Sequence, residues 1–169
     1  TVLDSGEIES IEAVLYDVTR RRQKEDAVRQ AAEHDPLTGL YNRRGAEAFL
    51  DKALTFAQGK GGQVLVMLMD LDGFKFINDT YGHAAGDEVL VQLAGRLDER
   101  IRRASDAVAR LGGDEFLVVM GDCGKDADGL HALACALVEM LSQPIILSTG
   151  TTVKVGASVG LAMYPTHGA

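Results

Sequence analysis

The stretch Arg110-Leu111-Gly112-Gly113-Asp114-Glu115-Phe116 decides the fold of this chain. Two adjacent glycines tolerate positive φ and permit a tight backbone turn. Apolar residues precede the turn over 107–111 and follow it over 116–120, which predicts a β-hairpin. Asp114 and Glu115 then lie at the hairpin tip, beside a strand apolar enough to be buried. Such carboxylates require a cation or a proton, unless they are the solvated acids of an ordinary polar turn.

A second apolar run, over residues 64–69, ends at Asp70-Leu71-Asp72. Its length and composition are typical of a strand buried on both faces. If this strand lies beside the hairpin, Asp70 and Asp114 converge, and carboxylate oxygens are the ligands that Mg²⁺ prefers. Two carboxylates holding two Mg²⁺ ions can serve phosphoryl transfer. We expect Asp72 to cap a short helix over 73–80 rather than to bind metal.

The composition bounds the class of protein. The chain has 169 residues and a formal net charge of −8, which suits one domain plus an appendage. The acidic balance argues against a nucleic-acid binder. We see no membrane-spanning run and no signal peptide, so we expect a cytoplasmic domain that reaches a membrane only through upstream segments. Cys123 and Cys135 have neither metal-site nor disulfide spacing, and we interpret them as reduced thiols.

The remaining periodicity predicts an α+β fold. Helices are expected over 43–57, 73–80, 87–103 and 130–141, and strands over 64–69, 107–111, 116–120, 144–147 and 151–163, the last two forming a pair. The order β-α-α-β-β-α-β, with one extra short strand, indicates a two-layer, ferredoxin-like antiparallel sheet with helices on one face.

Three separated motifs resemble the GGDEF family of diguanylate cyclases. They are Gly112 to Phe116, Asp70 to His83 continued by Gly86-Asp87, and His34 to Arg44. Their correct order argues against chance agreement, and the similarity runs from about Asp35 to the C-terminus. The resemblance implies the palm-like sheet of nucleotidyl cyclases, in agreement with the element order.

The resemblance implies a reaction as well as a fold. Two GTP molecules condense into cyclic di-GMP with loss of two pyrophosphates, each 3′-hydroxyl attacking the α-phosphate of the other GTP. One domain binds one GTP, so two domains must face each other in a homodimer. Two Mg²⁺ (or Mn²⁺) ions per active site are implied, with regulation by an upstream sensor.

The resemblance assigns the acidic residues to metal and to catalysis. Asp70, the Leu71 carbonyl and Asp114 correspond to metal ligands. Glu115 corresponds to a residue that either binds metal or activates the 3′-hydroxyl, and both roles stay open.

Nucleotide contacts are implied at two places. Gly112, Gly113 and the backbone amides of Gly73, Phe74 and Lys75 would approach the phosphates, and the Lys75 side chain would contact the triphosphate. Asn78 and Asp87 correspond to a guanine-reading pair. Without the resemblance, a helix C-terminal residue and an N-cap are the simpler interpretations of Asn78 and Asp87.

Arg103 and Asp106 resemble the inhibitory RxxD site, where cyclic di-GMP acts as feedback inhibitor. Five residues separate Asp106 from Gly112, as the family pattern requires. Arginine can donate two parallel hydrogen bonds to guanine and can also hold phosphate. The alternative is a helix-end arginine followed by a turn aspartate.

The expected layout has three parts. Residues 1–18 resemble the final strands of a PAS sensor domain, with an arbitrary strand-like tail as the alternative. Residues 19–34 are expected to form a linker helix compatible with a short coiled coil. Residues 35–169 are expected to be a GGDEF domain that stops before its last helix, and this fragment alone is expected to turn over GTP poorly.

Two alternatives to an active cyclase stay open. One is a non-catalytic GTP- or cyclic di-GMP-binding module attached to an EAL-type phosphodiesterase, because residues 160–168 resemble the ending of GGDEF domains in such tandems. The other is a dimerisation module without nucleotide chemistry.

Overall fold

The computed structural model describes residues 32–121, 124 and 127–168. The predicted PAS-like fragment and nearly all of the predicted linker helix lie outside these residues. Among the described helices, none combines the length and apolar character needed to cross a membrane.

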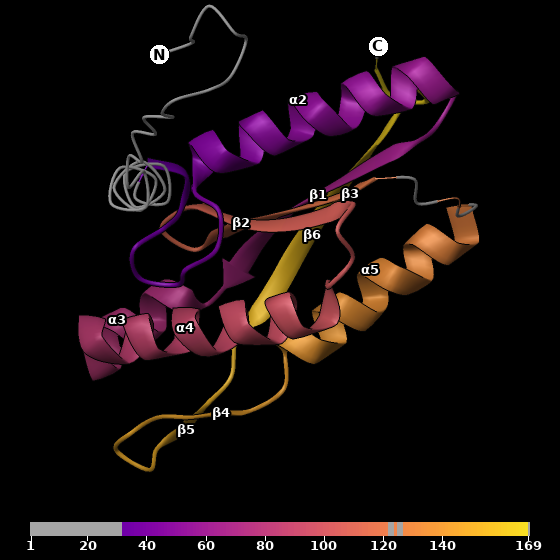
Figure 1. Ribbon diagram of the computed structural model, residues 1–169. Helices are drawn as coiled ribbons and strands as arrows, with labels where there is room; N and C mark the ends of the chain where they lie inside the picture. Colours follow the sequence, from indigo (N-terminus) through magenta and orange to yellow (C-terminus); the bar gives the residue numbers. More distant parts are fainter. Residues whose placement is uncertain (1–31, 122–123, 125–126, 169) are drawn as a thin grey trace, which may run out of the picture. The chain divides into compact units, whose positions relative to one another are not determined.

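Four strands form one antiparallel sheet in the spatial order β2-β3-β1-β6 (Figure 1). β1 (Val64–Asp72) pairs with β3 (Glu115–Gly121) on one side and with β6 (Gly156–Tyr164) on the other. β2 (Asp106–Gly112) lies at the edge beyond β3. This order belongs to the ferredoxin-like split β-α-β arrangement, so the predicted α+β fold is confirmed.

Helices cover both faces of the sheet. α2 (Arg43–Lys60) lies on one face, and α3 (Phe74–Tyr81), α4 (His83–Arg100) and α5 (Ala127–Leu141) lie on the other (Figure 1). The expectation that all helices share one face is therefore wrong for α2. The physical reason is that β1 is apolar at odd and even positions alike, so both of its faces need cover.

The alternation along β1 separates two clusters of apolar side chains. Leu65, Met67, Met69 and Leu71 pack into the larger core with helices α3, α4 and α5. Val64 and Val66 belong to a smaller cluster with α2. Further along β1 the even positions leave this cluster, and the side chains of Leu68 and Asp70 are exposed. The carboxylate of Asp70 thus reaches the surface near the end of β1, while the odd-numbered positions of the strand stay buried.

Two predicted helix starts are wrong. α4 begins at His83, after Gly82, so Asp87 lies in its second turn and is no N-cap. α3 follows Gly73, which adopts positive φ, and no side chain caps it. Asp72 instead accepts hydrogen bonds from the Ser158 hydroxyl at 3.0 and 3.2 Å, across the β1–β6 pair.

The predicted strand pair at the C-terminal end is only partly correct. β4 (Ile145–Ile146) pairs with β5 (Thr152–Val153) in a separate hairpin, and β6 then joins the main sheet. The hairpin is tied to α4, because Glu88 accepts hydrogen bonds from the Ser148 side chain and backbone at 2.6 Å each. These bonds lower the pKa of Glu88.

Phe116→Ala should cost about 3–5 kcal/mol of unfolding free energy, because the Phe116 side chain is fully buried and its removal leaves a cavity. The matched control is Phe76→Ala, since Phe76 is 66% exposed. This control should change the free energy by no more than about 0.5 kcal/mol. Urea denaturation measures both. Equal losses in the two variants would contradict the assignment of the core.

Candidate active site

The sheet register brings the two acidic motifs together. Asp70 on β1 lies directly opposite Glu115 on β3, so the two side chains share one face of the sheet. Cβ atoms at such paired positions are about 4.5–5.5 Å apart. The backbone N–H of Leu71 donates to the carbonyl oxygen of Asp114 at 3.3 Å. The backbone pairing therefore places Asp70, Asp114 and Glu115, here called the acidic cluster, beside Leu71 near one end of the sheet.

The turn beside this cluster depends on its two glycines. Gly112 has φ of 139° and Gly113 has φ of 55°, a region that side-chain-bearing residues rarely adopt. A Cβ added at either position would meet no atom within 4 Å. Backbone conformation rather than crowding thus requires glycine here, and the space above the turn is open to a ligand.

The start of α3 places backbone amides near the end of β1. Gly73 is its N-cap, and no side chain caps the helix. Free amides at a helix N-terminus favour phosphate oxygens. The Phe74 ring is buried in the core, so Phe74 offers its amide only, whereas the Lys75 side chain is exposed.

Asn78 and Asp87 come from two helices that pack closely. A Cβ added at Gly86 of α4 would overlap the Asn78 side-chain oxygen and approach the Phe74 ring. Asp87 is the next residue and is exposed. Gly86 precedes the helix expected from the sequence over 87–103, but it is a residue of α4 and allows α3 to approach α4 beside Asp87.

The donor set fits a metal ion that is shared with a ligand. Among the described residues, no three or more His, Cys, Asp or Glu side chains form a group able to hold a metal ion by themselves. Mg²⁺ is usually bound by one or two carboxylates, with water and substrate phosphates completing its shell. Asp70 and Asp114 with the Leu71 carbonyl match that smaller requirement.

Arg103 and Asp106 form a tight turn at the other end of β2. The Asp106 N–H donates to the Arg103 carbonyl at 2.9 Å, and the Ser105 hydroxyl donates to the Asp106 carboxylate at 2.9 Å. Arg103 is exposed. The length of β2, about 20 Å at about 3.3 Å per residue, separates this turn from the acidic cluster.

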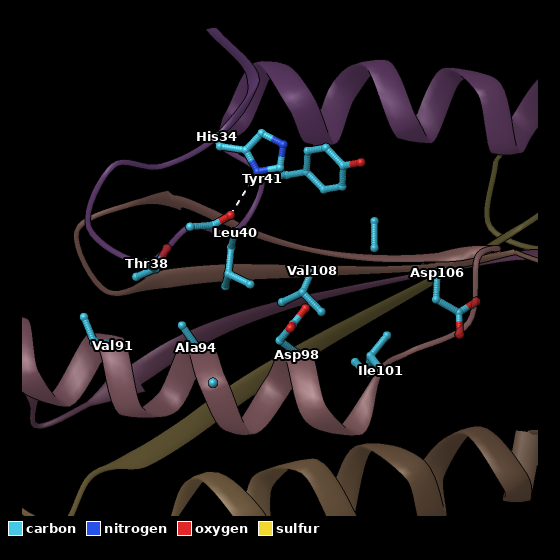
Figure 2. A pocket seen from close by; sticks show the side chains of 13 residues that line it. His34, Thr38, Leu40, Tyr41, Val91, Ala94, Asp98, Ile101, Asp106 and Val108 are labelled. Carbon is cyan, nitrogen blue, oxygen red and sulfur yellow. Dashed lines mark hydrogen bonds between the residues drawn. The ribbon is translucent and has the colours of Figure 1, made fainter. Parts of the chain in front are cut away.

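Cavities flank this turn on both sides. Asp106 lines a groove of about 420 Å³, where Figure 2 shows Ile101 between Asp106 and Asp98 of α4, and Leu40 farther along the groove beyond Val108. Ala104 and Ser105 line a second cavity of about 680 Å³, together with residues of α2 that include Lys52, Phe56 and Lys60.

Sequence reasoning gave no role to Arg110 and Arg43, which contact the acidic cluster or its turn, or to Asp35, which contacts Arg110. Arg110 donates to the Gly113 carbonyl and to the Asp35 carboxylate, and Arg43 lies 3.7 Å from Glu115. The available signal was an arginine in an otherwise apolar strand, because a buried guanidinium needs a carboxylate partner.

The charge of Asp35 is held by its partners. Burial raises the pKa of the Asp35 carboxyl, but hydrogen bonds from Thr38 and Arg110, with the positive charge of Arg110, outweigh burial and lower it below 3.8. The pKa of the Asp35 carboxyl is therefore lower in the folded protein than in the unfolded chain. The stabilisation is fully present above about pH 3.8 and is lost as the pH falls through the folded value.

Gly86→Ala should destabilise the domain by about 1–3 kcal/mol, because the new methyl group must displace Asn78 from the crossing of α3 and α4. Gly95→Ala is the matched control on the same helix, since a Cβ there meets nothing within 4 Å. The control should stabilise by up to about 1 kcal/mol through helix propensity. Urea denaturation of both variants measures the difference, and a stabilised Gly86→Ala variant would contradict the close packing.

Comparison with known proteins supports one family. The family model for the "Diguanylate cyclase, GGDEF domain" matches residues 32–169. Diguanylate cyclase TpbB from Pseudomonas aeruginosa is 42% identical over 161 residues, which cover 95% of this chain and 35% of that protein. The bifunctional diguanylate cyclase/cyclic di-GMP phosphodiesterase MucR from the same organism is 40% identical, with coverage of 99% and 24%. The chain thus spans about a third or less of the length of these relatives.

Solved structures agree with the family match. A sensory box/GGDEF family protein from Caulobacter crescentus has a TM-score of 0.75 at 41% identity, covering 80% of this chain and 86% of that one. The coiled coil and GGDEF domain of DgcB from Caulobacter crescentus, solved in complex with c-di-GMP, gives 0.77 at 29% identity, covering 86% and 76%. With the acidic cluster, the two-glycine turn and these matches in agreement, the chain belongs to the GGDEF domain family.

Proposed function

We propose that this chain is the catalytic domain of a diguanylate cyclase, which condenses two GTP molecules into cyclic di-GMP and two pyrophosphates. One observation carries the proposal. The β1–β3 register sets Asp70 opposite Glu115 beside an open two-glycine turn, in a chain of the GGDEF family. Relatives with 42% and 35% identity are named diguanylate cyclases.

Asn78 of α3 and Asp87 of α4 would recognise guanine where these two helices cross. The Asp87 carboxylate can accept hydrogen bonds from the N1–H and the exocyclic amine of guanine, whereas adenine offers no such pair of donors. Asn78, which packs on Gly86, supplies an amide beside it. The exposed Lys75 and the first amides of α3 would bind the triphosphate.

The acidic cluster would hold the metal ions that neutralise charge at the reacting phosphate. Asp70, Asp114 and the Leu71 carbonyl would hold two Mg²⁺ (or Mn²⁺) ions, which lower the pKa of the attacking hydroxyl and neutralise phosphate charge when bound. Glu115, opposite Asp70, would either join them or accept the proton of the 3′-hydroxyl. The protein otherwise contributes positioning.

One such domain provides half of the reaction centre. Each GTP offers its 3′-hydroxyl to the α-phosphate of the other, so a homodimer with facing sites would be needed. Gly112 and Gly113 are exposed, which leaves the hairpin tip accessible to a second domain. An upstream PAS-like sensor would control how the two domains meet. Because GTP is a cytoplasmic nucleotide, we place the domain in the cytoplasm.

Feedback inhibition is proposed at the Arg103–Asp106 turn. The exposed Arg103 guanidinium and the Asp106 carboxylate can bind guanine and phosphate groups of cyclic di-GMP. The adjoining cavity with Lys52, Phe56 and Lys60 provides room, an aromatic ring and positive charge. A microbial GGDEF domain at 32% identity has been solved with cyclic di-GMP, which supports binding of this ligand class.

Asp114→Asn should lower kcat by at least about 100-fold, because loss of a ligating oxygen is more costly than the loss of an outer partner. The whole protein is incubated with GTP and Mg²⁺, and both pyrophosphate and cyclic di-GMP are quantified. Product should disappear when EDTA removes the metal. Asp128→Asn, which removes an exposed carboxylate on α5, is the control and should retain activity. Full activity of Asp114→Asn would overturn the assignment of the cluster.

Arg103→Ala should weaken cyclic di-GMP binding by about 10-fold or more, the equivalent of one charge-assisted hydrogen bond. Arg102→Ala is the matched control, because it removes the same charge from the neighbouring exposed position. Isothermal titration calorimetry with cyclic di-GMP measures both affinities. Equal affinities for wild type and Arg103→Ala would refute the inhibitory site.

A further inference from the structure

An arginine stands in the apolar strand β2. Its neighbours Ala107, Val108 and Ala109 are buried, and the Arg110 side chain is only 13% exposed. A guanidinium withdrawn from water is costly unless it is paired and hydrogen-bonded. A well-packed apolar residue at this position would give the domain an equal or higher free energy of unfolding. Stability alone therefore does not explain the arginine, and the groups that it binds become the relevant feature.

Arg110 joins two parts of the chain. Its Nε and Nη2 donate to the Gly113 carbonyl at 3.0 and 2.9 Å. Its Nη1 donates to both carboxylate oxygens of Asp35 at 3.1 and 3.2 Å. The planar guanidinium has its donors in a fixed fork, so this one side chain binds two segments. One is the two-glycine turn at residues 112–115, here called the catalytic turn, and the other is residues 34–42, here called the leading loop.

The leading loop is a firm anchor. Asp35 accepts hydrogen bonds from the Thr38 amide at 2.9 Å and hydroxyl at 2.8 Å. The loop is also paired with the edge strand β2: the Tyr41 N–H donates to the Val108 carbonyl at 3.2 Å, and the Arg110 N–H donates to the Tyr41 carbonyl at 2.8 Å. The carboxylate that orients Arg110 is therefore fixed by side-chain and backbone bonds.

The grip on Gly113 reaches the acidic residue that follows it. A peptide unit is planar, so the Gly113 carbonyl and the Asp114 N–H move together. Fixing that carbonyl fixes the plane from which Asp114 begins, and the bond from Leu71 to the Asp114 carbonyl fixes its other side. The turn needs such support, because its two glycines have wide conformational freedom.

We propose that Arg110 is a positioning residue for Asp114 and Glu115, oriented by Asp35, so that the leading loop sets the geometry of the acidic cluster. The proposal rests on the proposed cyclase function for its kinetic readout only. Because the leading loop joins the domain to the preceding chain, a displacement of this loop would be passed to the catalytic turn through a single side chain.

The kinetic test uses the whole protein with Arg110→Lys and Asp35→Asn. Arg110→Lys keeps the charge and loses the fork, and Asp35→Asn keeps the shape and loses the charge. Each should lower kcat by about 10- to 100-fold, with KM for GTP within about 3-fold, since Asn78, Asp87 and α3 are untouched. The double variant should be little worse than either single one, because both break one chain of bonds.

Arg96→Lys is the matched control for a purely structural arginine. Arg96 also donates to backbone carbonyls, those of Met140, Gln143 and Pro144 at 3.3, 2.9 and 2.7 Å, but it links α4 to the end of α5. It should lower stability without lowering kcat at temperatures where the protein is folded. Unchanged cyclic di-GMP affinity in the Arg110 variant would show that the distant Arg103–Asp106 turn is intact.

Hydrogen–deuterium exchange at residues 112–115 provides a readout without turnover. Arg110→Lys should speed exchange of the Asp114 amide by about 10-fold, and Arg96→Lys should not. If wild type makes no cyclic di-GMP but exchange changes as expected, the proposed function fails and the positioning role stands. If wild type is active and Arg110→Lys alters neither exchange nor kcat, or if the two substitutions act additively, the positioning role is overturned.

Discussion

The antiparallel register between β1 and β3 is the constraint on which the site depends. It sets Asp70 against Glu115 and allows Leu71 to bond the carbonyl of Asp114. A shift by one residue would turn the odd-numbered side chains of β1, which fill the larger core, toward the opposite face. Core packing thus fixes the register, and the register fixes the acidic cluster. Stability and chemistry are specified by the same strand pairing.

The location of the cluster follows from how α2 covers the sheet. Val64 and Val66 are packed with α2, whereas Leu68 and Asp70 on the same face are exposed. This face of β1 therefore begins as buried core and ends as exposed surface, while the opposite face stays buried. The change from buried to exposed side chains occurs beyond the part of β1 that α2 covers. Helices α3 and α4, for which we propose nucleotide binding, follow β1 directly in the chain.

Local patterns in the sequence were sufficient for the hairpin, the buried strand β1 and the ferredoxin-like element order. They failed where contacts between distant residues decide the structure. Gly86 resembles a turn residue until its contact with Asn78 is known, which is why the start of α4 was misplaced. Arg110 and Asp35 are 75 residues apart, and no local period links them. The roles assigned to the site residues came from a family resemblance, which spacing alone could not supply.

The position of β1 in the sheet has a consequence during synthesis on the ribosome. Both of its partners, β3 and β6, come later in the chain than β1 itself. The apolar run over 64–69 therefore leaves the exit tunnel with two unpaired edges. These edges stay unpaired until the β2–β3 hairpin and then β6 have been synthesised. Segments of this kind are prone to associate with other chains while they wait. The strand that organises the finished domain is thus open to association with other chains until its partners have been synthesised.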